Sequence, residues 1–561
     1  MDVKEIQGAE YLCAYYTSDL LLSQDELIEH LKLYLTRYMI PTFFTQMDHL
    51  PMNANGKTDK KALPLPEKVT SQTYIKPLNE MEEKICDIFA ETLSLDQVGR
   101  NDNFFEIGGT SLLATRLTVK AANAGIKIAY ADVFKYQTPE KMSEFLLQSE
   151  QKTGAVGCRQ DEIKNFDYAT IDELLKTNAM SYLQGIGHLE EEKIGNILLT
   201  GSTGYLGIHI LREYLRDFEG TAYCIVRPKA NLSGEMRLRN MLMFYFDSDF
   251  DELFGSRIIP VEGEITDQNS IELFKNYPIH TIINCAANVK HFAAGSEIEN
   301  INVGGVVNLI SLCKEIKARL IQISTHSIAG ISIGNQPPEN TKLFESDLFI
   351  GQDLENKYVN SKFLAERAVL ANIADGLDAK IMRVGNLMAR NSDGEFQINF
   401  NSNAFMGKLR AYKLIGAFPY SAMEASVEFA PIDSTAAAIL NLSQTPEQFR
   451  VFHPYNNHTI TMGDVIYAMI DYGFEIELVE DAVFKDKLDK AMNDDKLNPY
   501  LSGIIAYTNT EGHIHISYLG SDQRFTTNML FRRNYKWPLT TDDYLQKMIK
   551  AIDGLGFFNI Q

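Results

Sequence analysis

The sequence predicts a multidomain protein with a small α+β subdomain, a helical bundle, and an α/β unit built on a parallel sheet. Its 561 residues correspond to about three or four folding units. Two stretches interrupt the hydrophobic patterns: a proline-rich one at Leu63–Glu67 that stays polar to Pro77, and a polar, small-residue one at 148–160. Beyond the second stretch, short apolar strands alternate with helical patterns. The expected units are therefore 1–66, 77–150 and 160–561.

Composition and charge exclude several classes of function. The net charge of −21 disfavours binding to nucleic acid, because phosphate backbones repel an acidic chain. No apolar run reaches the roughly 20 residues of a membrane span, and the N-terminus lacks the apolar core of a signal peptide. The six cysteines are scattered without metal-ligand spacing. We therefore expect a cytoplasmic protein with free thiols, no metal site and no membrane partner.

In the first unit, the run from Glu10 to Tyr16 predicts a strand, and Pro41 opens a second one. Between them, Ser23 caps a predicted helix whose apolar residues follow helical spacing: Leu27, Ile28, Leu31 and Leu35. Residues 53–57 have turn composition.

In the second unit, three helices are expected. One runs near Glu80–Leu93, a second begins near Ser111, and a third begins at Thr138-Pro139-Glu140, where proline suits the first turn. These helices predict a small bundle.

In the third unit, helical stretches separate short apolar runs, which predicts a parallel sheet with helices on both faces. The predicted strands are 196–200, 221–226, 257–261, 281–284, 319–323 and 380–384.

A glycine-rich turn follows the first of these strands and opens a helix. The segment from Thr200 to Gly207 reads TGSTGYLG, with the GxxGxxG spacing that lets a backbone approach a pyrophosphate at a helix N-terminus. The next strand ends in Arg227-Pro228-Lys229, where an acidic residue would suit NAD. The basic pair instead favours the extra phosphate of NADPH.

A second cluster of polar residues suggests proton transfer. Tyr358 and Lys362 are spaced one helical turn apart, so a nearby ammonium is expected to lower the pKa of the tyrosine. The strand ending in Ser324-Thr325 brings hydroxyls to the edge where parallel sheets bind ligands. Thr325 is the candidate donor to a carbonyl oxygen, and Ser324 is its rival.

These motifs resemble the extended short-chain dehydrogenase/reductase family: TGSTGYLG, then ISTHS at 323–327, then YVNSK at 358–362. The resemblance covers about 194–435 and implies a Rossmann-like fold, with a substrate subdomain mainly at about 390–561. It implies Thr325, Tyr358 and Lys362 as catalytic residues, although Glu264 stands where that family usually has aspartate. The implied cofactor-binding residues are Thr200, Gly201, Thr203, Gly204, Tyr205, Leu206, Gly207, Arg227, Lys229, Glu264, Ile265, Ala286, Ala287 and Lys362.

The second unit resembles the carrier (thiolation) domains of nonribosomal peptide synthetases. Its signature is DNFFEIGGTSL at 102–112, and the resemblance implies a 4′-phosphopantetheine arm on Ser111. A serine at a helix start suits a phosphodiester, because the helix N-terminus is the positive end of its dipole.

The first unit resembles the small C-terminal subdomain of adenylation enzymes. The likeness rests on the segment from Leu50 to Pro64, which contains an NGK turn, and it implies that Lys57 contacts an acyl-adenylate. The large subdomain with the nucleotide pocket is absent from this sequence, so we expect no adenylation by the chain alone.

The order of carrier and reductase resembles the terminal thioester reductases of peptide synthetases. It implies that an aminoacyl or peptidyl thioester on Ser111 is reduced by NADPH to an aldehyde, and that a second hydride would give an alcohol. The implied partners are upstream synthetase domains and a phosphopantetheinyl transferase. Three alternatives remain: a non-redox Dieckmann-type release domain, a nucleotide-sugar epimerase or dehydratase, and a non-catalytic docking module.

Overall fold

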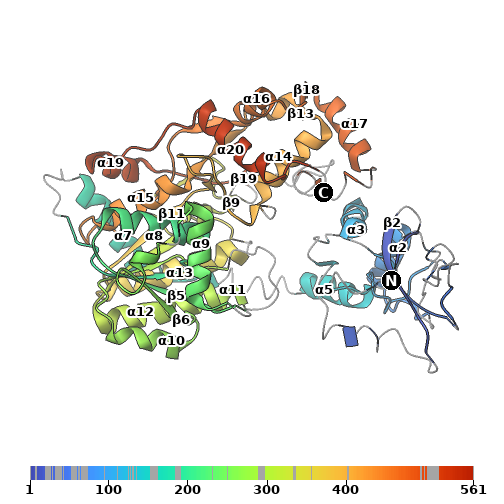
Figure 1. Ribbon diagram of the computed structural model, residues 1–561, viewed down its shortest axis with the longest axis horizontal. Helices are drawn as coiled ribbons and strands as arrows, with labels where there is room; N and C mark the ends of the chain where they lie inside the picture. Colours follow the sequence, from blue (N-terminus) through green and yellow to red (C-terminus); the bar gives the residue numbers. More distant parts are fainter. Residues whose placement is uncertain are drawn as a thin grey trace. The chain divides into compact units, whose positions relative to one another are not determined.

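The computed structural model separates the chain into two compact units (Figure 1). One unit comprises Met1–Cys158 with Met492–Pro499, and the other comprises Arg159–Ala491 with Tyr500–Gln561. The structure describes residues 2–6, 9–18, 27, 30–31, 41, 43–47, 49–51, 58, 60, 63–64, 74–93, 95, 97–105, 107–109, 111–123, 126, 128, 132–133, 136–151, 162–183, 191–229, 232–248, 250–288, 297–332, 336–354, 357–400, 403–492, 494, 496–497, 500–501, 504 and 517–559.

The N-terminal region forms a three-stranded sheet. Strand β1 (Asp2–Ile6) pairs antiparallel with β2 (Ala9–Tyr16), which pairs parallel with β3 (Phe43–Gln46). The Tyr15 hydroxyl donates to the Pro64 carbonyl at 2.6 Å, which fastens the proline-rich stretch to the sheet. The two predicted strands are present and β1 is additional, whereas most of the helix expected after Ser23 lies outside the described residues.

Three helices between residues 80 and 151 begin close to the residues that the sequence indicated. They are α2 (Glu80–Leu93), α3 (Ser111–Asn123) and α5 (Pro139–Gln151). Phe89 on α2 packs edge-on against Phe104 at the centre of one apolar core. The buried Glu82 carboxylate accepts hydrogen bonds from Arg100 at 2.9 Å and from the Leu78 amide at 2.8 Å. These contacts compensate the cost of removing its negative charge from water.

The second unit contains a seven-stranded sheet in which every pairing is parallel. Its spatial order is β16-β11-β8-β7-β4-β5-β6, with β4 at the point where the direction of winding reverses. In that order the strands are β16 (Val451–Phe452), β11 (Ala379–Val384), β8 (Arg319–Thr325), β7 (Thr281–Asn284), β4 (Ile197–Thr200), β5 (Ala222–Val226) and β6 (Ile258–Glu262).

Helices cover both faces of this sheet because alternate strand residues point to opposite sides (Figure 1). In β4, Leu198 faces one apolar core and Ile197 and Leu199 face the other. The helices of the first core are α7 (Ala169–Leu183), α10 (Gln268–Glu272), α12 (Gly305–Ile316) and α13 (Lys357–Ala374). Those of the second are α8 (Tyr205–Asp217), α9 (Gly234–Phe246), α15 (Ile432–Ser443) and α19 (Arg524–Arg532).

A third apolar core, which includes Met388, Phe429 and Phe558, lies in the C-terminal part of this unit. Its helices are α14 (Ala404–Ile415), α16 (Met462–Tyr472) and α20 (Asp542–Gly554), and α17 (Asp481–Met492) follows in the same part of the chain. The same part of the unit contains short strands: β12 (Leu387–Met388), β13 (Ala417–Pro419), β14 (Ser426–Glu428), β15 (Ala430–Pro431), β17 (Thr459–Thr461) and β18 (Glu477–Val479). No helix among the described residues is long and apolar enough to cross a membrane.

Short pairings also tie the C-terminal segment to the loops that follow β8. Strand β9 (Ile331–Ser332) pairs with β19 (Ser517–Tyr518), and β10 (Lys342–Leu343) pairs with β20 (Gly520–Ser521). The residues just after β20 are thereby brought to the carboxyl edge of the large sheet.

Candidate active site

The turn between β4 and α8 forms the floor of a cleft. Gly201 has φ +67°, a conformation that favours glycine, and a Cβ there would lie 2.7 Å from the Ala286 backbone nitrogen. A Cβ on Gly207 would overlap the carbonyl of Gly201. The glycines therefore allow three backbone segments to meet, and they leave the N-terminus of α8 open to a ligand.

The cleft is a cavity of about 380 Å³ at the point where the strand order reverses. Several predicted cofactor residues line it: Gly201, Thr203, Gly204, Arg227, Glu264, Ile265, Ala286 and Ala287. A glycine cradle, a helix N-terminus and apolar walls fit a dinucleotide. The residues present therefore suit NADPH or NADH as the bound group.

Four predicted cofactor residues outside this lining have structural contacts instead. Thr200 is buried, and its Oγ1 accepts from the Ala286 amide at 3.1 Å, so it holds the ends of β4 and β7 together. The Tyr205 hydroxyl donates to the Met388 carbonyl at 2.9 Å, and Leu206 is buried in the core. Lys229 is exposed and its backbone pairs with Leu232.

Two arginines form the basic end of the cleft. Arg227 is largely exposed, and its Nη1 lies 3.2 Å from a Glu264 carboxylate oxygen. Arg237, on α9, also lines the cavity and donates to the Arg227 carbonyl. The sequence interpretation missed Arg237, since an arginine in an amphipathic helix carries no signal that separates it from a surface charge.

The three predicted catalytic residues belong to two adjoining elements. Thr325 is the last residue of β8, and Tyr358 and Lys362 lie in the first two turns of α13. The buried Lys362 Nζ donates to the Ile323 carbonyl at 3.0 Å, which ties the start of α13 to the end of β8. Thr325 Oγ1 accepts from the Ser327 amide at 3.2 Å. Its rival Ser324 is buried, and the Ser324 hydroxyl has no hydrogen-bond partner among the described residues.

The protonation states differ from what the sequence suggested. Burial raises the pKa of Tyr358 to about 12, rather than the neighbouring lysine lowering it. Burial likewise lowers the pKa of Lys362 to about 8. The reason is that the Tyr358 hydroxyl and the Lys362 ammonium are both removed from water, which disfavours the charged form of each. The ammonium is also already hydrogen-bonded to the Ile323 carbonyl. In this structure Tyr358 is a neutral phenol, a form that can donate a proton.

Asn302 connects this corner to the cofactor cleft. Its side-chain oxygen accepts from the amide of Asn288, which lines the cleft, at 2.8 Å. Its side-chain nitrogen donates to Ser361 Oγ at 2.9 Å, and that hydroxyl donates to the Tyr358 carbonyl at 2.7 Å. Asn302 therefore positions the first turn of α13 against the cleft. The sequence interpretation gave Asn302 no such role.

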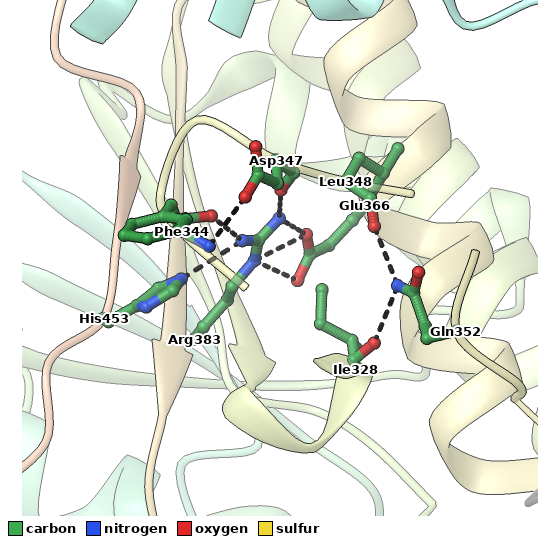
Figure 2. A network of polar contacts seen from close by, with 8 residues as sticks. All are labelled: Ile328, Phe344, Asp347, Leu348, Gln352, Glu366, Arg383 and His453. Atoms are coloured by element: carbon green, nitrogen blue, oxygen red, sulfur yellow. Dashed lines mark hydrogen bonds and ion pairs between the residues drawn. The ribbon is translucent and has the colours of Figure 1, made fainter. Parts of the chain in front are cut away.

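A buried ion pair joins α13 to the neighbouring strand β11 (Figure 2). Arg383 on β11 and Glu366 on α13 are fully buried, 2.9 Å apart. Arg383 also donates to the carbonyls of Phe344 and Asp347, and its Nη1 lies 3.1 Å from His453 Nε2. Because every polar edge of the guanidinium has a partner, strand, helix and loop are held in one arrangement.

A second cavity, of about 940 Å³, adjoins the end of β8. Its lining includes His326, which directly follows Thr325, together with Glu428 and Tyr455. His326 packs against the Tyr455 ring at 5.5 Å between centroids.

The carrier region contributes one predicted attachment residue. Ser111 is the first residue of α3, as expected for a residue at a helix start. Lys57, predicted to contact an acyl-adenylate, lies outside the described residues.

Comparison with known families assigns both regions. Residues 83–146 match the model of the phosphopantetheine attachment site, and residues 199–439 match an NAD-binding model described as male sterility protein. The class that fold and site define is thus an NAD-binding enzyme of Rossmann-like fold, preceded by a phosphopantetheine carrier region.

Comparison with single proteins gives the family. A thiolation-reductase di-domain from an archaeal non-ribosomal peptide synthetase matches with TM-score 0.74 and 38% identity over 87% of this chain and 100% of that one. The aureusimine biosynthetic cluster reductase domain matches with TM-score 0.57 and 26% identity over 69% of this chain and 98% of that one. The chain therefore belongs to the thiolation-reductase family of nonribosomal peptide synthetases.

Longer proteins also match most of this chain. One linear gramicidin synthase subunit of Brevibacillus parabrevis is 28% identical over 97% of this chain, and the chain spans 11% of that protein. L-2-aminoadipate reductase large subunit of Candida glabrata is 27% identical over 85% of this chain, which spans 37% of it.

Proposed function

We propose that the chain releases an aminoacyl or peptidyl group from its carrier by reducing the thioester to an aldehyde with NADPH. The observation that carries this proposal is the Lys362–Ile323 hydrogen bond, which brings the helix of Tyr358 to the strand end of Thr325. Through Asn302, the same corner is linked to the dinucleotide cleft. The family membership supports the same reaction.

Each residue has a defined part in this reaction. Bound NADPH supplies a hydride to the thioester carbonyl carbon. Thr325 and Tyr358 donate hydrogen bonds to the carbonyl oxygen, and the Tyr358 proton neutralises the charge that develops on it. Lys362 holds the cofactor ribose and stabilises the tyrosinate left behind. The resulting hemithioacetal breaks its carbon–sulfur bond, so that an aldehyde leaves and the carrier regains its thiol.

Arg227 and Arg237 support the choice of NADPH over NADH. Both line the end of the cleft beyond β5, where the ribose of the adenosine half is expected, and a phosphate there would gain charge-assisted contacts. Arg227 already shares its charge with Glu264, so Arg237 supplies the second cation that a phosphate dianion requires.

The carrier part of the proposal assigns the arm to Ser111, loaded by a phosphopantetheinyl transferase and charged by upstream synthetase domains. Surfactin synthase subunit 1 of Bacillus subtilis, 38% identical over 151 residues, supports a synthetase setting. Residues 1–66 would then be the end of an adenylation domain, with Lys57 at its acyl-adenylate. We infer a cytoplasmic setting, where NADPH and these partners occur.

The direct test uses the whole chain. Ser111 is loaded with an aminoacyl-phosphopantetheine, NADPH is added, and the product is identified by mass spectrometry. An aldehyde or alcohol with stoichiometric NADPH oxidation is expected. Release of a cyclised product with no NADPH consumed would instead indicate the Dieckmann-type reaction and overturn the proposal.

A further inference from the structure

Glu428 lies at the same sheet edge as the proposed catalytic residues, although no sequence motif points to it. Val384, the last residue of β11, pairs with Thr325 of β8, so Gly385 and Asn386 continue beside His326. Glu428 Oε2 accepts a hydrogen bond from the Asn386 amide at 2.9 Å. Adjacent parallel strands are about 4.8 Å apart, so this contact places the carboxyl at the same edge of the sheet as the end of the Thr325 strand.

The Asn386 side chain also lies near this carboxyl, yet the other carboxyl oxygen makes no hydrogen bond within the part of the chain that the structure describes. Glu428 Oε1 is buried without a hydrogen bond among the described residues, and the residue lines the cavity of about 940 Å³. A Cβ on Gly385 would overlap the Glu428 carboxylate, so the absence of a side chain there gives the carboxyl its position. A buried polar atom left unpaired costs stability, which suggests that a ligand supplies its donor.

The surroundings leave the carboxyl without a cation. Burial lowers the pKa of His326 to about 4, so its ring is neutral. Asp522 is paired with Arg524 at 2.8 Å, and Lys342 is exposed. The Tyr455 hydroxyl is bonded to Ser521 Oγ at 2.8 Å. Among the charged groups in the described lining, Glu428 is therefore the one that has a buried acceptor oxygen without a hydrogen bond and that forms no ion pair.

We propose that Glu428 binds the free α-ammonium group of an aminoacyl thioester, so that the reductase unit selects acyl groups that carry an amine beside the reacting carbonyl. This inference rests on the proposed function. In such a substrate the amine is two bonds from the carbonyl carbon, so a substrate whose carbonyl oxygen meets Thr325 can direct its nitrogen toward the side of the cavity that holds this carboxyl. Burial raises the pKa of Glu428 to about 8, so the group ionises most readily when a cation lies beside it.

Binding without turnover tests the inference separately from the chemistry. The probes are three amides that share an N-(2-acetamidoethyl) tail: alaninamide, its N-acetyl derivative and propanamide, titrated into the whole chain by calorimetry. A charge-assisted contact predicts about 10- to 100-fold tighter binding of the free amine than of the other two. Equal binding of all three, or undetectable binding of all three, overturns the inference.

Reduction of the corresponding thioesters gives the second readout. Glu428→Gln keeps the shape and removes the charge, so the kcat/KM ratio of alanyl to propanoyl thioester should fall about tenfold or more. The exposed Glu424→Gln is the matched control and should keep the wild-type ratio. A wild type that reduces both thioesters at equal kcat/KM overturns the inference even if Glu428→Gln does not fold. If no thioester is reduced, the proposed function fails, whereas the calorimetric preference still decides the role of Glu428.

Discussion

The carrier region and the reductase unit place their reactive groups in opposite ways. The carrier has an apolar core, and its predicted attachment serine is the first residue of helix α3. The reductase unit buries Lys362 in its proposed site, and it buries the Glu366–Arg383 ion pair between the adjoining helix α13 and strand β11. An added arm can supply the chemistry of a carrier, so its fold needs only one accessible serine. A reductase must hold charges out of water, so its site and its stability depend on the same contacts.

The largest expected effect tests the carrier side of this comparison. Ser111→Ala should abolish loading by a phosphopantetheinyl transferase completely, because the variant lacks the hydroxyl that accepts the arm at that helix start. Reduction of a soluble acyl thioester should stay unchanged, because the two sites belong to different units. Intact-protein mass spectrometry after incubation with the transferase measures the loading. A mutant that still gains the arm would contradict the assignment.

On the reductase side, Tyr358→Phe should reduce turnover about 10²- to 10⁴-fold, because it removes the proton donor and keeps the ring. NADPH affinity should hardly change. Lys362→Ala should lose both rate and cofactor affinity. Single-turnover NADPH oxidation and cofactor titration measure the two quantities, with the exposed Tyr420→Phe as control. A Tyr358→Phe variant within threefold of the wild-type rate would contradict the mechanism and favour a non-redox reaction.

Glu366→Gln tests whether site and stability are coupled. Removing one partner of a buried ion pair leaves Arg383 uncompensated, so the free energy of unfolding should fall by about 3–5 kcal/mol. Urea unfolding followed by circular dichroism measures the change, with the exposed Glu424→Gln as control. An effect below about 1 kcal/mol would mean that solvent reaches the pair.

A smaller effect is expected at the rim of the cofactor cleft. Arg227→Ala should weaken NADPH by about 10- to 100-fold while leaving NADH affinity nearly unchanged, because only NADPH presents a phosphate there. Arg237→Ala should act in the same direction. The exposed Arg532→Ala serves as control, and fluorescence titration gives the affinities. Equal affinity of the wild type for both cofactors would refute the preference.

The smallest effect concerns pH. Burial raises the pKa of Glu345 to about 7, from an ordinary value of 4.5. Between these values the folded chain keeps a proton that the unfolded chain loses, so stability falls as pH rises through that window. Glu345→Gln should flatten this slope by at most about 1.4 kcal/mol per pH unit. Urea unfolding at several pH values between 4.5 and 7 measures the slope, and an unchanged slope would show that Glu345 is ionised when folded.

Local pattern predicted most of the fold. The strand that ends at Thr200 and the glycines that follow it are recognisable from a short stretch of sequence, and the same holds for the helix starts at Ser111 and Pro139. Strand β1 was not predicted, because its sequence DVKEI has three charged and only two apolar residues and so lacks a clear hydrophobic pattern. The short parallel edge strand β16 was missed for a related reason, since two residues carry no periodicity.

The candidate site was only partly predictable. The signals for Thr325, Tyr358 and Lys362 are short motifs, but their pKa values depend on burial, which spacing does not reveal. Arg237 and Glu428 reach the site from elements that share no motif with it. They meet the predicted residues only through strand order and tertiary contacts, which a single sequence does not state.

The all-parallel sheet has a consequence for how the chain acquires its structure during synthesis. Each pairing joins distant segments, such as Ile197 with Thr281 and Ile381 with Val451, so the sheet closes long loops before it gains its contacts. The helices of the carrier region pack within one short stretch of chain and precede the sheet in order of translation. On the ribosome the carrier is thus expected to reach its native state while the reductase unit still awaits its last strand, exposed to chaperones and proteases.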